Sequence, residues 1–362
     1  MASIFFTVTN ELSFDQRMIR ICTSLSHAGY HVTLVGCLKT KRSLLPAQPF
    51  AQKRLPVLFK TGKLFYAEYN IRLFFFLLFR KMDGICAIDL DTILPCYLIS
   101  RIKKIPRIYD AHELFCEMKE VVSRPRIYSV WKWIEKHTVP HFEKGYTVNQ
   151  PIADEFKKMY AVQYPVVRNI SVYMEAVADA PREKFILYQG AVNEGRCFET
   201  LLPAMKQVAA PLLVCGTGNF VGEAKALVQQ LGLAEKVIFK GTILPADLRK
   251  ITNTAYIGLT LFEKGSLSNY YSLANRFFDY IHSGVPQLCV NYPVYKELNN
   301  LYNVAVVIDQ PDSDSIAAAL NNLLDDDSKW KILNDNCRIA ARELNWQQEE
   351  KKLIAFYKNI FG

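Results

Sequence analysis

Short apolar runs of β type alternate along the chain with longer stretches in which apolar residues recur at helical spacing. In the first half, the strand-like runs cover residues 4–9, 31–35, 85–88, 107–109 and 146–149. Helical stretches separate them at residues 18–25, 64–81 and 92–101, and a further one follows at 152–160. Strands alternating with helices predict a parallel α/β sheet.

The second half repeats this alternation after a linker-like stretch at 175–181. Its strand-like runs cover residues 185–188, 211–215, 236–239, 256–260 and 287–290. Its helical stretches cover residues 198–208, 273–281 and 313–324, and closing helices contain Trp330, Trp346 and Phe356. A chain of 362 residues suits two domains, and we predict them at 1–170, joined by the C-terminal helix 346–362, and at 171–345. Two such domains facing one another would enclose a binding cleft.

The stretch 266–286 reads as a polar loop that leads into a helix. Ser272 precedes an apolar run over 273–281 that ends before Gly284. A helix start offers unpaired N–H groups and partial positive charge, so a phosphate or diphosphate is a natural ligand there. Asp279, one turn into the helix, can reach a hydroxyl of such a ligand. The alternative is an ordinary surface loop followed by a packed helix.

Polar residues also follow the strands of the first half. Ligands of parallel sheets lie beyond the carboxyl ends of the strands, which places residues 10–17 at the edge of a site. The strand at 107–109 leads directly into Asp110, His112 and Glu113. A carboxylate beside an imidazole fixes its tautomer and raises its basicity, which suits proton or hydroxyl handling. His137 and His141 have helical spacing but no third ligand nearby, so no metal site is predicted.

Glycines follow two strands of the second half. Gly190 and then Arg196 come after the first of these strands, where the backbone can approach a ligand and a guanidinium can clamp a phosphate. Gly216 and Gly218 follow the next strand, but Val221 stands where a dinucleotide-binding fingerprint needs its third glycine. A glycine turn is therefore favoured over NAD binding.

Charge is concentrated in the first half of the chain. Residues 1–168 hold 25 Lys and Arg against 14 Asp and Glu, whereas residues 169–362 hold 19 against 21, within a total of +9. Nucleic acid, an anionic membrane face or an acidic substrate could each explain a basic half. The helix at 64–81 combines aromatic residues and leucines with flanking cations. It is either a core helix of the first domain or a membrane-surface contact.

Cysteine usage and the absence of long apolar segments predict a cytoplasmic protein. The nine cysteines form no C-x-x-C pair and mostly lie in apolar runs, which suits buried thiols in a reducing compartment. No apolar stretch reaches 18 residues, and no basic leader opens the sequence.

Several stretches together resemble the retaining nucleotide-sugar glycosyltransferases of the GT-B fold, in particular glycosyltransferase family 4 (group 1). The stretches that carry the resemblance are residues 9–17, YDAHELF at 109–115, VVRN at 166–169, YQGAVNEGR at 188–196, CGTGN at 215–219 and LANRFFDYIHSGVP at 273–286. Each is weak alone, whereas their order and separation make a strong combination. The resemblance implies two Rossmann-like, doubly wound domains facing across a cleft.

By resemblance, a UDP- or GDP-sugar is the donor, and no other cofactor and no metal are needed. Asp279 would bind the ribose, Arg196 would neutralise the diphosphate, and the loop 241–244 would hold the base. The donor-binding residues implied in full are Gly190, Arg196, Gly216, Gly218, Thr242, Ile243, Tyr271, Ser272, Leu273, Asn275 and Asp279.

The resemblance assigns the first domain to the acceptor. His112, with Asp110 and Glu113, would reach the sugar or the reacting centre, and Asn10, Asp15 and Arg17 would line the acceptor side. The expected activity is hexosyl transfer with retention to a glycan or lipid-linked acceptor in polysaccharide biosynthesis. The expected partners are the donor, this acceptor and the cytosolic face of the inner membrane, but no nucleic acid.

Two positions depart from the family pattern. Tyr271 stands where the family has the first of two glutamates, and Ala191 stands where it commonly has arginine. Glu263 is a candidate substitute for the missing carboxylate. A hydrolysing sugar-nucleotide epimerase of the same architecture and a non-catalytic partner subunit therefore remain as alternatives.

Overall fold

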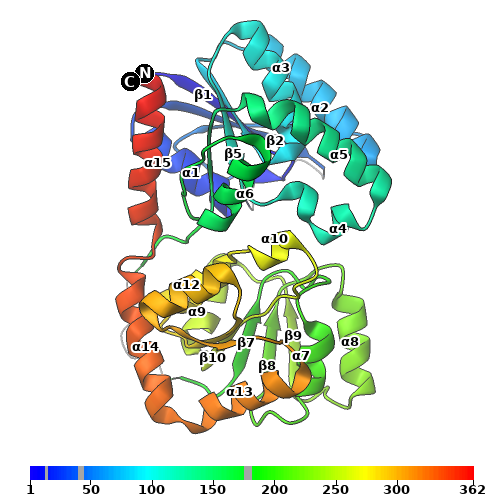
Figure 1. Ribbon diagram of the computed structural model, residues 1–362, viewed down its shortest axis with the longest axis vertical. Helices are drawn as coiled ribbons and strands as arrows, with labels where there is room; N and C mark the ends of the chain where they lie inside the picture. Colours follow the sequence, from blue (N-terminus) through cyan, green and yellow to red (C-terminus); the bar gives the residue numbers. More distant parts are fainter. Residues whose placement is uncertain (13–14, 40–44, 175–181) are drawn as a thin grey trace. The chain divides into compact units, whose positions relative to one another are not determined.

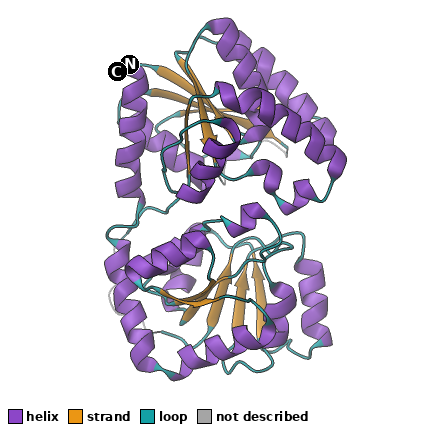
Figure 2. Ribbon diagram, viewed as in Figure 1, coloured by secondary structure: helices purple, strands orange, loops and turns teal. Residues whose placement is uncertain are grey.

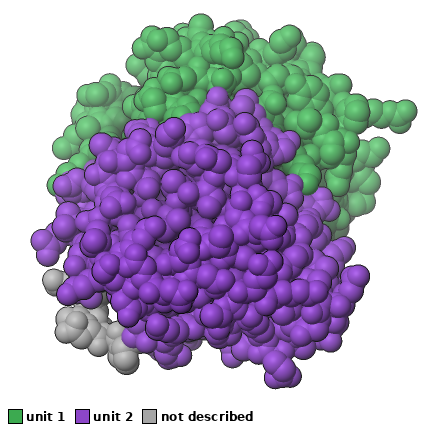
Figure 3. Space-filling model, turned by 60° about the horizontal axis from the view of Figure 1, so that its bottom comes forward, with its two compact units in different colours: residues 1–169, 349–362 green, residues 170–348 purple. Residues whose placement is uncertain are grey.

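The computed structural model describes residues 1–12, 15–39, 45–174 and 182–362 (Figure 1). The linker predicted at 175–181 lies outside the described residues. Contacts divide the chain into two units, of which unit 1 comprises residues 1–169 and 349–362 and unit 2 comprises residues 170–348 (Figure 3).

Six parallel strands form the sheet of unit 1, in the order β3-β2-β1-β4-β5-β6 (Figure 2). The strands are β1 (Ser3–Thr7), β2 (His31–Leu38), β3 (Ala51–Pro56), β4 (Gly84–Ile88), β5 (Arg107–Ala111) and β6 (Lys144–Thr147). The helices are α1 (Gln16–His27), α2 (Gly62–Leu78), α3 (Ile93–Lys103), α4 (Lys119–Val122), α5 (Pro125–Thr138), α6 (Gln150–Tyr160) and α15 (Trp346–Phe361). The strand order reverses between β1 and β4, which makes their carboxyl ends the expected ligand position of this sheet.

Helices cover both faces of this sheet. Phe5 of β1 packs against Phe76 of α2, and its neighbour Phe6 packs against Tyr357 of α15 on the other face. The last helix thus completes the core of unit 1, and an added Cβ at Gly84 would collide with the ring of Phe361.

Unit 2 repeats the arrangement with six parallel strands in the order β12-β11-β10-β7-β8-β9. The strands are β7 (Ile186–Gln189), β8 (Leu212–Cys215), β9 (Val237–Gly241), β10 (Ile257–Thr260), β11 (Gln287–Val290) and β12 (Ala305–Ile308). The helices are α7 (Phe198–Ala204), α8 (Val221–Gln230), α9 (Pro245–Thr254), α10 (Leu267–Tyr270), α11 (Asn275–His282), α12 (Pro293–Tyr302), α13 (Ser313–Asp325) and α14 (Asp327–Ala341). Here the order reverses between β7 and β10. The predicted fold class, two doubly wound parallel sheets, is confirmed.

Helix α2 is apolar on more than one side. Its buried residues Phe65, Tyr69, Leu73 and Leu77 recur every four positions and form the stripe that faces the core. On other sides of the helix, Ile71, Phe75 and Phe79 just beyond its end are 59%, 55% and 81% exposed. The helix at 64–81 is therefore a core helix that also presents apolar side chains to solvent.

The sequence patterns missed one edge strand in each sheet, β3 in unit 1 and β12 in unit 2. β3 pairs only with β2 and carries the polar sequence AQKRLP, of which Leu55 alone is buried. β12 pairs only with β11. For β3, the edge position explains the miss, because a strand with one solvated face lacks the continuous apolar run of a central parallel strand. β12 does have an apolar sequence, AVVI, which the prediction overlooked.

Candidate functional site

The turns after β7 and β8 pass each other in direct contact, and glycines make this possible. An added Cβ at Gly216 would lie 1.8 Å from the carbonyl oxygen of Gly190, and one at Gly218 would lie 2.3 Å from that of Val192. Gly190 and Gly216 also have φ angles of +122° and +152°, which other residues rarely adopt. Close packing of the two turns therefore requires glycine at positions 216 and 218, independently of their predicted role in donor binding.

Arg196 lies in the loop between β7 and α7. Its Nη1 donates to Oδ1 of Asn269 at 2.9 Å, and its guanidinium carbon lies 4.5 Å from the ring centre of Phe262. These contacts connect the loop after β7 with helix α10 and with the segment after β10. Arg196 is thus fixed at the carboxyl side of the sheet, where it was expected.

Asp279 of α11 is held by two hydrogen bonds. Ser171 Oγ donates to its Oδ1 at 2.6 Å, and Gln189 Nε2 donates to its Oδ2 at 3.0 Å. Gln189 is the last residue of β7, and its own Oε1 accepts from Thr252 Oγ1 at 2.7 Å. The carboxylate is half-buried and oriented from both sides, with lone pairs left to accept a further hydroxyl.

The segment before Asp279 differs from the prediction. Residues 267–270, which were expected to be loop, form the short helix α10, whose start is capped by the Ser266 side chain through the N–H of Asn269. Helix α11 begins at Asn275 rather than at Leu273, because the chain must first leave α10.

The family resemblance also implies that the backbone amides of residues 272–275 cradle the diphosphate, and two of these four amides already have partners. The Ser272 N–H donates to the carbonyl oxygen of Asn269, and the Ala274 N–H donates to the hydroxyl of Tyr295 at 3.0 Å. Leu273 is half-buried and Asn275 is exposed, while the ring of Tyr271 packs on Tyr270.

The loop between β9 and α9 carries the two residues expected to hold the base. Thr242 is exposed, whereas Ile243 is half-buried and packs on a cluster that includes Leu187, Cys215 and Tyr280. The loop follows the edge strand β9, which is separated from β10 by β8 and β7 in the sheet.

Arg17 and Asp110 form a buried ion pair in unit 1. Arg17 Nη2 lies 2.5 Å from Asp110 Oδ1, and Arg17 Nε donates to Oδ2 at 3.3 Å. Both side chains are almost fully buried, so their charges satisfy one another inside the fold. Asp15 has a local role too, since its side chain caps α1 through the N–H of Met18 and accepts from Asn10 Nδ2 at 3.0 Å.

The carboxylate that holds His112 is Asp89. His112 Nδ1 lies 3.1 Å from Asp89 Oδ2, and the His112 backbone N–H donates to Asp89 Oδ1 at 3.0 Å. The expectation that Asp110 or Glu113 would do this was wrong. Asp110 instead forms the buried ion pair with Arg17. Glu113 is half-buried at the same strand end.

Electrostatics at this strand end raise two pKa values. Burial and the nearby Arg17 lower the pKa of His112, but the charge and hydrogen bond of Asp89, together with the charge of Asp110, raise it, and the net shift is upward. Burial, followed by repulsion from Asp89, raises the pKa of Asp91 to about 7. Asp91 accepts a short hydrogen bond from the hydroxyl of Thr9, just beyond β1. These groups gather where the strand order reverses between β1 and β4.

The sequence of unit 2 matches a known family. Residues 171–344 match the model described as "Glycosyl transferases group 1". This part of the chain is a group 1 glycosyltransferase domain. No curated protein matches the sequence.

Solved structures resemble the whole chain at the level of fold. Sucrose-phosphate synthase from Thermosynechococcus elongatus matches with a TM-score of 0.85 at 16% identity, covering 100% of this chain and 99% of that one. Anabaena HepE in complex with UDP and glucose matches with a TM-score of 0.75 at 12% identity, covering 99% and 100%. WaaG, a glycosyltransferase involved in lipopolysaccharide biosynthesis, matches with a TM-score of 0.69 at 16% identity, covering 99% and 100%. The chain has the GT-B fold.

Four functional candidates were missed at the level of sequence. Asp89 and Gln189 stand at the carboxyl ends of β4 and β7, so the strand-end rule applied to Asp110 could have found them. Arg276 is a cation within an apolar helical run, where a charged side chain is unusual and indicates a specific partner. Ser171, which holds Asp279, gave no such signal.

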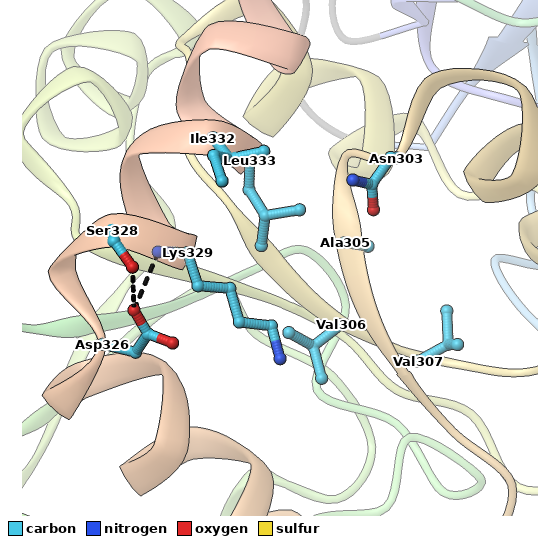
Figure 4. Close-up of a pocket in the computed structure, with 9 residues that line it drawn as sticks. All are labelled: Asn303, Ala305, Val306, Val307, Asp326, Ser328, Lys329, Ile332 and Leu333. Carbon is cyan, nitrogen blue, oxygen red and sulfur yellow. Dashed lines mark hydrogen bonds between the residues drawn. The ribbon is translucent and has the colours of Figure 1, made fainter.

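Two hollows on the surface of unit 2 lie away from the candidate site residues. One of about 620 Å³ is lined by β12 and by the start of α14 (Figure 4). Its polar groups are engaged, since Asp326 accepts from the Ser328 hydroxyl at 2.6 Å and from the Lys329 N–H at 2.9 Å. A second, of about 520 Å³, is lined by Arg182, Tyr256 and Trp330 among others. None of the predicted site residues lines either hollow.

Proposed function

We propose that this glycosyltransferase transfers a hexose or related sugar from a nucleoside-diphosphate sugar to a glycan or lipid-linked acceptor. The observation that carries the proposal is the group 1 match over residues 171–344, because Arg196, Gly190 and Asp279 gather within that segment at the carboxyl side of one sheet. UDP is the first choice of nucleotide, since HepE of the same fold was solved with UDP and with UDP-glucose. GDP is the alternative.

In the proposed reaction, the carbon–oxygen bond between the sugar and the diphosphate breaks, the acceptor oxygen bonds to the same carbon from the same side, and the hydroxyl proton passes to the departing diphosphate. Arg196 and the start of α11 stabilise the negative charge of the departing diphosphate. Asp279, oriented by Ser171 and Gln189, accepts from the ribose hydroxyls. This assignment uses no metal.

His112 and Asp89 are proposed to serve the acceptor. A carboxylate on Nδ1 orients the ring and favours its protonated form, which leaves Nε2 to contact the sugar or the incoming hydroxyl. Asp89 has a φ angle of 53°, an uncommon backbone conformation for a residue other than glycine. Strain of this kind gathers at functional sites.

A membrane contact is proposed for the face of unit 1 formed by α2 and α5. Phe75 of α2 and Trp133 of α5 are 55% and 58% exposed, and the rings of Tyr66 and Trp131 join the two helices at 5.4 Å. The cations on or beside these helices are Lys60, Lys63, Arg72, Arg80, Lys81, Arg124, Arg126, Lys132 and Lys136. Exposed aromatic residues with flanking cations suit an anionic lipid interface. Among the described residues, no helix is long and apolar enough to cross a bilayer.

The decisive experiment begins with thermal shift of the purified chain against UDP, GDP and their sugars. Stabilisation by one nucleotide is expected. Arg196→Ala and Asp279→Ala should then raise the donor KM or abolish transfer without unfolding the protein. Unchanged activity in both variants would contradict the site. Release of free epimerised sugar without acceptor would favour the epimerase, and no binding of either nucleotide at millimolar concentration would favour a non-catalytic subunit.

A further inference from the structure

Arg276 is a buried cation at the place where the strand order of unit 2 reverses. It is the second residue of α11 and only 7% exposed. Its guanidinium carbon lies 4.5 Å from the ring centre of Tyr188 in β7 and 4.8 Å from that of Phe262, just beyond β10. Because β7 and β10 are the two strands between which the order reverses, the guanidinium occupies the expected ligand position of this sheet.

The charge of Arg276 is not neutralised within the described residues. Its Nη1 donates to the carbonyl oxygen of Gln189 at 3.2 Å, while Nε and Nη2 are buried and have no hydrogen-bond partner there. None of the ion pairs formed by the described residues includes it. A buried cation without a counter-ion is costly, and the two rings repay only part of that cost. The arrangement therefore favours an anion as a further partner.

Open space lies directly beside this cation. Of the atoms in the described residues, Arg276 Nη1 at 3.2 Å is the one that lies within 4 Å of an ideal Cβ at Gly190, its chain neighbours left aside. Gly190 itself is exposed. A ligand that approaches the Gly190 backbone, as the missing side chain permits, must meet the guanidinium.

A second cation faces the same ring. The guanidinium carbon of Arg196 lies 4.5 Å from the ring centre of Phe262, the ring that Arg276 also contacts. Two guanidinium groups held near one aromatic ring present donors from which a single diphosphate can accept hydrogen bonds.

We propose that Arg276 binds the diphosphate of the donor together with Arg196, on the side of Gly190. This inference rests on the proposed use of a nucleoside-diphosphate sugar and adds the residue that recognises its phosphates. Arg276 would hold the diphosphate in the donor complex and share the charge that develops on it as the sugar departs. The opposing possibility is a purely structural arginine that links Tyr188 to Phe262.

The test measures binding of UDP, UMP and uridine by calorimetry to the wild type and to Arg276→Gln and Arg276→Lys. Loss of charge in Arg276→Gln should weaken UDP binding roughly ten- to hundredfold while uridine binding is unchanged. Arg276→Lys keeps the charge and should retain most of the UDP affinity. A structural arginine would instead give two variants that melt at lower temperature and bind UDP and uridine with the same ratio as the wild type.

Arg182→Gln is the matched control. Arg182 is also a partly buried arginine of unit 2 with an aromatic neighbour, Trp330 at 5.9 Å, but its guanidinium donates to backbone carbonyls away from the candidate site. It should leave the UDP-to-uridine ratio unchanged. Equal UDP affinity in wild type and a folded Arg276→Gln would overturn the role of Arg276 alone. A wild type that binds neither UDP nor GDP, with the GDP series run in parallel, would overturn the proposed function itself.

Discussion

His112 is held by Asp89 through both its ring and its backbone, although the two residues are 23 positions apart in sequence. Replacing Asp89 by Asn removes the negative charge that raises the pKa of His112, so this pKa should fall. If His112 serves the acceptor, transfer should drop about tenfold or more. Histidine NMR titration together with steady-state kinetics measures both effects. Asp154→Asn, on the exposed side of α6, is the control, and an unchanged His112 titration in Asp89→Asn would contradict the assignment.

Asp91 should make stability depend on pH. Its pKa is about 7 in the folded chain, raised mainly by burial, whereas an unfolded aspartate titrates at about 4. Stability contributed by the protonated form is therefore complete below pH about 4 and is lost as pH rises through about 7. The side chain of Asp91→Asn stays neutral at every pH. The melting temperature of this variant minus that of the wild type should therefore increase by a few degrees from pH 5 to pH 8. A difference that stays constant over this range would refute the prediction.

Gly216 is expected to tolerate no side chain. An added Cβ meets the Gly190 carbonyl oxygen at 1.8 Å, so Gly216→Ala should separate the turns after β7 and β8 and destabilise unit 2 by several kcal/mol. Gly222→Ala is the control, because nothing lies within 4 Å of its Cβ position in α8, and it should be neutral or stabilise by about 0.5–1 kcal/mol. Urea denaturation of both variants checks the contrast; similar stabilities would exclude this packing.

Replacing Ser171 should weaken donor binding while leaving the rest of the fold intact. Ser171→Ala removes one of the two donors that orient Asp279, so the donor KM should rise about threefold to tenfold with little change in kcat. Ser129→Ala, whose hydroxyl bonds only within α5, is the matched control. A fall in kcat at constant KM would assign Asp279 a role other than ground-state binding.

Apolar side chains on α2 should govern membrane association. Phe75→Ser and Phe79→Ser each remove exposed aromatic surface and should lower binding to vesicles with anionic lipid by about tenfold. Ile332→Ser and Ile339→Ser, on exposed positions of α14, are the controls. Co-sedimentation with phosphatidylglycerol vesicles, compared with phosphatidylcholine vesicles, measures the effect. Equal binding by all four variants would remove α2 from the proposed interface.

Sequence patterns predicted the central strands of both sheets because buried parallel strands are short, continuous apolar runs. They also predicted the glycine turns and the strand end at Asp110, since both depend on local sequence. The partner of His112 could not be read in this way, because it depends on which strands become neighbours and which face each side chain takes. The role of Arg276 was hidden for the same reason: the rings of Tyr188 and Phe262 meet it only in the folded unit.

The polypeptide enters unit 2 at residue 170 and returns to unit 1 at residue 349. Unit 2 is therefore one continuous segment. The core of unit 1, in contrast, is incomplete until Tyr357 and Phe361 pack against Phe6 and Gly84. During synthesis, the domain that is translated first can complete its folding only after residues 349–362 have left the ribosome. A nonsense mutation at residue 349 would consequently damage the opening domain while sparing the one directly upstream of the stop.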